Sequence, residues 1–299
     1  MAGRQKKKPA PKRRRRIGLA MGATVAALLA LCAGAMHLNA RIVHVRYAEA
    51  VLSDLPAGFD GTRVLFVTDV DLCGTNTAAN VRRVFQKLQA LQPDLLLLGG
   101  DYASPSLLER LNGRTGDDEI AARRDFFAAI ADFQAPLGKL AVSGDNDGDA
   151  DSLQMAMIGS GVQLIDGSVC TIEKNGESIA VVGVGETGGD VAACAAQLSA
   201  DQCAIALLHR PSKAVDVRIA EASGGGMWAD LVLAGHTHGG QLQVAGRSAL
   251  SLEAEEKRYP SGWTDGDAPM LISQGLGCEG ANFRFGSQAE VWLITLWKK

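Results

Sequence analysis

The chain has 299 residues, of which 47% are hydrophobic and 21% charged, so it can build a large globular core. Its charge is divided unevenly. Residues 1–16 hold nine of the 30 Lys and Arg residues and no acid, so the remainder carries 21 basic and 33 acidic residues. Because this remainder is acidic, it lacks the basic balance of nucleic-acid-binding domains, and we expect no nucleic-acid partner.

The N-terminus has the pattern of a membrane anchor. Basic residues gather between Arg4 and Arg16, and residues 17–40 then contain no Asp, Glu, Lys or Arg. About 20 apolar residues suffice to cross a bilayer, and basic residues before such a span favour a cytoplasmic N-terminus. We therefore expect the rest of the chain to lie outside the cytoplasm. The alternative is export after signal cleavage, because the small residues at 33–35 resemble a cleavage site.

The sequence predicts four segments. They are a basic cytoplasmic tail over 1–16, a transmembrane anchor or signal segment over 17–40, a linker with a first strand over 41–54, and one domain over 55–299. The six cysteines include no CxxC pair, so a zinc knuckle is not indicated. Outside the cytoplasm Cys194 and Cys203 could form a disulfide, but the sequence does not decide their pairing.

Apolar runs and periodicity predict alternating strands and helices in the domain. Strands are expected at 64–68, 94–98, 139–143, 169–174, 178–184, 203–208, 230–234, 270–273 and 290–296, and helices at 80–91, 119–133, 152–160, 191–198 and 214–222. Asn175-Gly176 predicts a hairpin between two of the strands. This alternation is typical of an α/β domain, here with two sheets.

Five of the predicted strands are followed within a few residues by aspartate or histidine. These residues are Asp69, Asp71, Asp101, Asp145, His209, His236 and His238. A single Asp after a strand usually caps a helix or forms a turn. Five such strand ends are hard to obtain from capping alone, and sites in α/β sheets gather outside the carboxyl ends of strands. Mixed carboxylate and imidazole ligands suit a pair of divalent ions.

The most specific motif is Gly-His-Thr-His-Gly-Gly-Gln at 235–241. With Asp-x-Asp at 69–71, Gly-Asp at 100–101, Gly-Asp-Asn-Asp at 144–147 and His209, it resembles the calcineurin-like metallophosphoesterase family. The turn and the tail from 272 to 296 are similar to the membrane-anchored bacterial branch, some members of which act on lipid-linked phosphodiesters or pyrophosphates. The resemblance covers roughly 60–297. It implies a four-layer α/β/β/α sandwich, preceded here by one transmembrane helix.

The resemblance also implies a ligand set. One metal would be held by Asp69, Asp71, Asp101 and His238, and the other by Asp101, Asp145, His209 and His236. Asp101, His209 and position 146 would serve catalysis. The ions would be two of Mn, Fe, Zn or Mg, and the reaction would be hydrolysis of a phosphodiester, phosphomonoester or pyrophosphate. The substrate, a phosphorylated small molecule or a lipid, and the oligomeric state stay open.

Three positions depart from the family pattern. The family has His where Asp71 stands, Asn where Asp145 stands, and His where Asn146 stands. Four aspartates cancel the formal charge of two divalent ions, and Asn146 cannot donate a proton usefully near neutral pH. An alternative is therefore a membrane-tethered pseudoenzyme that binds metal or phosphate. A minor alternative is a phosphatase of the haloacid-dehalogenase type, because residues 66–71 resemble its nucleophile motif.

Overall fold

The computed structural model describes residues 12–113, 116–244, 247–248, 258–259, 261–264 and 268–299. Two six-stranded sheets form the body of these residues. The first runs in the order β1 (Val43–Leu52), β14 (Ala289–Lys298), β2 (Arg63–Val67), β3 (Leu95–Leu98), β4 (Lys139–Ala141) and β5 (Val162–Leu164). The second runs in the order β12 (Gly262–Thr264), β13 (Met270–Ile272), β9 (Leu231–Ala234), β8 (Ala204–Leu208), β7 (Glu177–Val184) and β6 (Val169–Lys174). A small ribbon pairs β10 (Gln243–Val244) with β11 (Arg247–Ser248).

The two sheets pack face to face because their strands are apolar on both sides. In β2, Val64 and Phe66 belong to the cluster between the sheets, together with Ile205 and Leu207 of β8. The intervening residues of β2 turn to the opposite face, as the strand period of two requires. Strands buried on both faces read as continuous apolar runs, which is why the sequence predicted them well.

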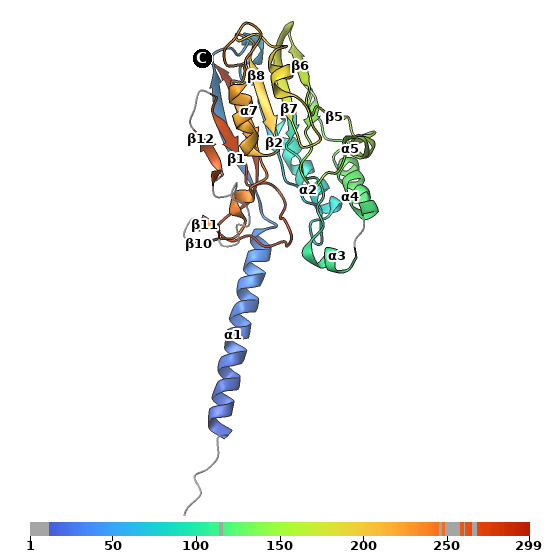
Figure 1. The fold of residues 1–299 in the computed structure, drawn as a ribbon. Coiled ribbons are helices and arrows are strands. Elements are labelled where there is room, and N and C mark those ends of the chain that lie inside the picture. The colour runs from blue at the N-terminus through green and yellow to red at the C-terminus, as the bar shows by residue number, and fades with distance from the viewer. Residues whose placement is uncertain (1–11, 114–115, 245–246, 249–257, 260, 265–267) are drawn as a thin grey trace, which may run out of the picture.

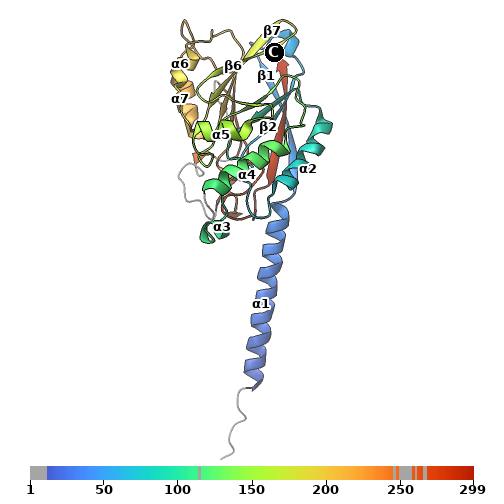
Figure 2. The same ribbon diagram turned by 90° about the vertical axis from the view of Figure 1, so that its right-hand side faces the viewer.

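Helices cover the two outer faces (Figures 1 and 2). The first sheet is covered by α2 (Ala78–Leu88), α4 (Gly116–Ala129) and α5 (Ala150–Met157), and the second by α6 (Val191–Ala195) and α7 (Ala214–Ile219). In α2, Thr77 caps the first turn by accepting a hydrogen bond from the Asn80 backbone N–H, and Phe85 is buried against the sheet. The predicted four-layer α/β/β/α architecture is confirmed.

Several elements differ from the sequence prediction. The first strand, expected within the 41–54 segment together with a linker, occupies Val43–Leu52 and pairs with β14 along its whole length. The short elements α3 (Leu107–Leu111), β5, β10, β11 and β12 were not predicted, because each spans only two to five residues and shows no period. Short 3-10 turns occur at Ala57–Phe59, Gln89–Leu91, Pro211–Lys213 and His238–Gly240. Cys194 and Cys203, which the sequence left as a possible pair, are both free and buried.

The N-terminal helix α1 (Lys12–Asn39) projects away from the domain (Figure 1). Its segment Arg16–Asn39 is long and apolar enough to cross a membrane. A signal sequence meets the same criteria of length and composition, so this helix by itself does not separate an anchor from a signal.

Candidate metal centre

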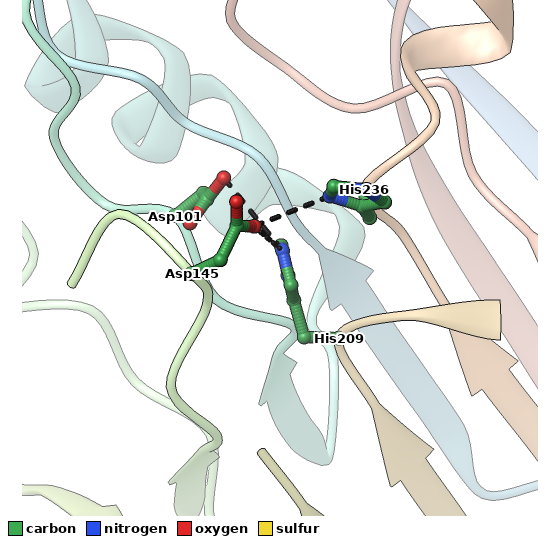
Figure 3. Close-up of side chains that lie close together, drawn as sticks. All are labelled: Asp101, Asp145, His209 and His236. Carbon is green, nitrogen blue, oxygen red and sulfur yellow. Dashed lines mark hydrogen bonds and ion pairs between the residues drawn. The ribbon is translucent and has the colours of Figure 1, made fainter. Parts of the chain in front are cut away.

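The predicted ligands converge where the carboxyl ends of the two sheets meet. β2, β3 and β4 are neighbours in the first sheet, and β8 and β9 are neighbours in the second. The residues that follow these strands are therefore brought to one place. Among the described residues, Asp101, Asp145, His209 and His236 each offer a ligand atom, and these four atoms all lie within 4.8 Å of one another (Figure 3).

Asp145 is the hub of this group. Its Oδ1 lies 2.8 Å from His209 Nε2 and 3.2 Å from His236 Nδ1. Asp101 Oδ2 lies 3.7 Å from His209 Nε2. Burial favours the neutral carboxyl of Asp145, but hydrogen bonds from His209 and His236 outweigh it and hold the pKa of Asp145 well below its usual range. The ring nitrogens and the carboxylate oxygens thus face a shared space, as metal ligands do.

The orientation of His209 is fixed by the backbone. Its Nδ1 lies 2.8 Å from the carbonyl oxygen of Gly99, which can only accept, so Nδ1 carries a proton. In the neutral ring, Nε2 then offers a lone pair towards the two carboxylates. A carbonyl that fixes the far nitrogen is the usual support of a metal-binding histidine. Burial opposes protonation, but Asp101 and Asp145 outweigh it and raise the pKa of His209, so in the absence of a metal this ring is a cation.

Asp69, Asp71 and His238 form a second group beside the first. His238 Nε2 lies 3.5 Å from Asp71 Oδ2 and 3.9 Å from Asp69 Oδ1. Asp69 also accepts hydrogen bonds from the His236 backbone N–H and from the Thr68 hydroxyl. Burial and then the guanidinium of Arg284 lower the pKa of His238, so its ring stays neutral.

The carboxylates in this second group lack a counter-charge. Asp69 and Asp71 are fully buried, and Asp71 Oδ2 has no hydrogen-bond partner among the described residues. Burial raises the pKa of Asp69 to about 6, and burial together with the charges of Asp101 and Asp69 raises that of Asp71 well above its usual range. An orphaned oxygen beside a neutral imidazole and two further carboxylates fits a divalent cation.

The backbone at these turns is in an unusual conformation. Five of the predicted ligands have positive φ angles: Asp69 at 50°, Asp71 at 45°, Asp101 at 55°, His236 at 68° and His238 at 49°. Residues other than glycine rarely adopt this left-handed region, and when they do they cluster at functional sites. The sequence gives no signal for this, because His and Asp at strand ends are compatible with ordinary turns.

Three supporting residues were missed by the sequence analysis. Fully buried Asp147 accepts hydrogen bonds from the backbone N–H groups of Asp101, Tyr102 and Gly144, and so holds the turn that carries Asp101. Arg284, also fully buried, donates to the carbonyl of His238 at 3.3 Å. Arg210 lies 3.0 Å from Asp145 Oδ2 and 2.8 Å from His236 Nε2. Only the position of Arg210 directly after His209 could have indicated it.

Asn146 and Arg210 change the interpretation of the departures from the family pattern. The Asn146 side chain donates to Asp101 Oδ2 at 2.9 Å, and its backbone N–H donates to Asp101 Oδ1 at 2.9 Å. Asn146 therefore orients Asp101. The ion pair with Arg210 offsets the extra negative charge of Asp145, so the centre as built is less negative than the four aspartates alone indicate.

Relatives of the chain were found by sequence. The metallophosphoesterase YkuE of Bacillus subtilis is 23% identical over 89% of this chain and 93% of its own length. The phosphodiesterase YaeI of Escherichia coli is 25% identical over 84% of this chain and 87% of its own. A metallophosphoesterase of Aquifex aeolicus is 24% identical over 87% of this chain and 94% of its own. No family model matches.

Solved structures resemble the chain more distantly. The calcineurin-like phosphoesterase YfkN of Bacillus subtilis aligns over 78% of this chain and 90% of that structure, with 14% identity and a TM-score of 0.37. The sequence relatives extend over nearly the whole chain and carry the name that the strand-end motifs predicted. The chain is therefore similar over most of its length to metallophosphoesterases and phosphodiesterases, which hydrolyse phosphate esters.

Proposed function

We propose that this chain is a membrane-anchored phosphoesterase that uses two divalent metal ions to hydrolyse a phosphodiester, phosphomonoester or pyrophosphate bond. The observation that carries the proposal is the group of Asp101, Asp145, His209 and His236, whose ligand atoms lie within 4.8 Å of one another. The buried Asp71 Oδ2, which has no hydrogen-bond partner among the described residues, lies beside this group and supports a second ion. Asp101, whose turn lies between the two groups, would be shared by both ions.

The residues of the chain have separate tasks in this proposal. Asp69, Asp71, Asp101 and His238 would hold one ion, and Asp101, Asp145, His209 and His236 the other. Such ions, when bound, polarise the phosphoryl group and activate water at neutral pH. His209 would be kept in the ligand form by the Gly99 carbonyl, and Asn146 would hold Asp101 in register. Arg210 would clamp Asp145 and His236.

The second candidate is a pseudoenzyme that binds metal or phosphate without turnover. The hydrogen bond from the Asn146 amide to Asp101 favours the pseudoenzyme, because Asn146 then supplies no proton to a leaving group. Positioned acid catalysis contributes roughly 10²–10⁴-fold, so its loss slows esters of poor leaving groups most. The seven residues of the predicted ligand set support the metal centre that both candidates can use, and the names of the sequence relatives favour the enzyme.

We further propose that α1 is a retained anchor and that residues 41–299 lie outside the cytoplasm. The basic run before the uncharged segment supports this orientation. Protease added to intact spheroplasts should digest the domain. A domain that stays protected until the membrane is broken would reverse the orientation.

The decisive test measures metal content and turnover on one preparation. The full chain, purified in detergent and loaded with Mn²⁺, should hold about two ions and hydrolyse bis(p-nitrophenyl) phosphate. Asp101→Ala should lose most of both, while Asp94→Asn, at the opposite end of β3, should lose neither. Two bound ions without turnover of nitrophenyl or alkyl esters would favour the pseudoenzyme. An absence of bound metal would remove the enzyme and leave only a pseudoenzyme that binds phosphate.

A further inference from the structure

We propose that α3 is a second membrane contact, and that its leucines lie in the lipid–water boundary of the same bilayer that α1 spans. This inference rests on the anchoring role proposed for α1. It assigns a partner, a lipid bilayer, to a surface of the domain that the catalytic proposal does not use.

The leucines of α3 form an exposed apolar face. Leu107, Leu108 and Leu111 are 60%, 72% and 74% exposed. Their spacing places all three on one side of the helix. Single exposed leucines are ordinary on soluble surfaces, but a concentrated apolar face on a five-residue helix has a cost in water that burial in lipid removes.

The helix is held in this position. The Leu107 N–H donates to the carbonyl of Gly280 at 2.8 Å, and the Gly74 N–H donates to Glu109 Oε1 at 3.1 Å. Ser106 and Glu109 close a capping box at its first turn. α3 is thus attached to neighbouring loops at its first residue and at Glu109 in its middle, and the exposure of its leucines is a property of the docked helix.

The position of α3 selects the bilayer as its partner. In both views α3 lies level with the end of α1 that joins the domain (Figures 1 and 2). The uncharged run begins at Ile17, and about 20 residues from there reach Met36, where the hydrocarbon core would end. Met36 is also where the domain begins, because its carbonyl accepts a hydrogen bond from the Arg284 N–H at 3.1 Å. No spacer separates the membrane-spanning segment from the domain. A surface of the domain at the same height as the Met36 contact therefore lies at the lipid headgroups.

Two further contacts fix the joint between α1 and the domain. His37 Nδ1 lies 2.9 Å from the carbonyl of Asn282, and the Asn39 side chain donates to the carbonyls of Arg284 and Ser287 at 3.1 and 3.0 Å. These bonds limit tilting of the domain against the helix. The level of α3 relative to the bilayer is therefore set by α1.

The surface between α1 and α2 has headgroup chemistry. A cavity of 160 Å³ at the end of α1 is lined by Arg41 and Arg83 together with the amides of Asn76, Asn80 and Asn282. Arginine side chains bind phosphate groups through charge-assisted hydrogen bonds, so these two suit the phosphates of phospholipids. At this end of the domain, the apolar face of α3 matches the acyl boundary of a bilayer, and the basic cavity matches its headgroup layer.

This contact would place the metal centre against the membrane. Asp101 precedes α3 by six residues, and Gly74, which bonds to α3, follows Asp71 by three. The loops that carry two of the proposed ligands therefore lead directly into the membrane-contacting surface. A phosphate ester in the headgroup layer would reach the centre without leaving the bilayer.

The test uses the full chain in phosphatidylcholine vesicles. The two cysteines that are not buried, Cys32 and Cys170, are replaced by serine. A single Leu108→Cys is then labelled with an environment-sensitive fluorophore. The matched control is Ile219→Cys, whose native side chain is also 72% exposed, on helix α7, which lies away from α1 (Figure 1). Flotation of the vesicles after an alkaline carbonate wash reports the insertion of α1 independently.

In vesicles, we expect the label at position 108 to emit at a shorter wavelength than the label at position 219. We also expect lipids that carry a nitroxide near the headgroup to quench the label at 108. The label at 219 should show neither effect. A chain that floats while both labels behave as in water would overturn the contact and leave the anchor standing. A chain that fails to float would overturn both. A shorter emission wavelength at position 108 that is lost on dilution of the chain in lipid, without quenching by nitroxide lipids, would assign the surface to a second copy.

Discussion

Replacing Asp69 by asparagine should stabilise the metal-free protein at pH 8 and weaken its stabilisation by metal. Asp69 is fully buried and its pKa rises from 3.8 to about 6. The unfolded chain releases this proton near pH 3.8, whereas the folded chain holds it until about pH 6. Wild-type stability is therefore unaffected below pH 3.8 and falls as the pH rises through this window.

The size of the effect follows from the shift. A pKa rise from 3.8 to about 6 in a buried group corresponds to a loss of about 3 kcal/mol of folding free energy above pH 6. Asparagine is isosteric, does not titrate, and retains an acceptor for the His236 N–H. In EDTA at pH 8 the variant should melt roughly 6–12 °C above wild type, and at pH 3.5 the difference should vanish.

Metal should oppose this advantage. An ion present at 100 times its dissociation constant stabilises the folded chain by about 2.7 kcal/mol, and the variant lacks one charged ligand. Melting in detergent, with EDTA or with Mn²⁺, measures both effects. The control is Asp94→Asn. The wild-type Asp94 carboxylate accepts a hydrogen bond from the Arg63 N–H at 2.7 Å. The difference in melting temperature between this variant and wild type should be the same in EDTA and in Mn²⁺. A variant that is less stable than wild type in EDTA at every pH, or that gains as much from Mn²⁺ as wild type, would refute the reasoning.

Three further outcomes are expected. The double variant His236→Ala, His238→Ala should lower the Mn²⁺ bound per chain, measured by mass spectrometry, from about two towards none, while His44→Ala, on β1, should bind as much Mn²⁺ as wild type. A double variant that binds as much Mn²⁺ as wild type would remove the two histidines from the site. Asn146→His should raise turnover of an alkyl phosphodiester by roughly tenfold or more, because it restores a proton donor, and should change the nitrophenyl ester little; a gain on the nitrophenyl ester alone would contradict this role. Burial raises the pKa of Asp230 to about 6, so Asp230→Asn should raise the unfolding free energy at pH 7 by about 1 kcal/mol after discounting for solvent screening, and urea titrations at pH 3.5 should show no gain; a gain that persists at pH 3.5 would mean that charge is not the cause.

The sequence predicted the strands and the turns of the candidate site because both depend on local signals. The run Leu95–Leu98 is buried on both faces, and an apolar run of that kind indicates a central strand whatever its neighbours are. Asp101 follows it within three residues, so finding the strand also found the turn. The convergence of such turns then follows from the parallel arrangement of strands.

The supporting contacts that the sequence did not predict join residues that are far apart in the chain. Arg210 contacts Asp145, 65 positions away, and Arg284 contacts His238, 46 positions away, and nothing in either local sequence indicates these partners. Helix α3 was missed for a different reason. Its five residues are too few for an apolar period to indicate a helix.

The joint between α1 and the domain has a kinetic consequence under the proposed anchoring. A flexible linker would let a tethered domain sample a volume several nanometres deep. The hydrogen bonds of Asn39 and Met36 leave no such linker, so the domain keeps one height and moves only by lateral diffusion. For an ester carried by the same membrane, the encounter rate is then set by its mole fraction in the lipid. Adding inert lipid should slow turnover, and diluting the vesicles with buffer should not.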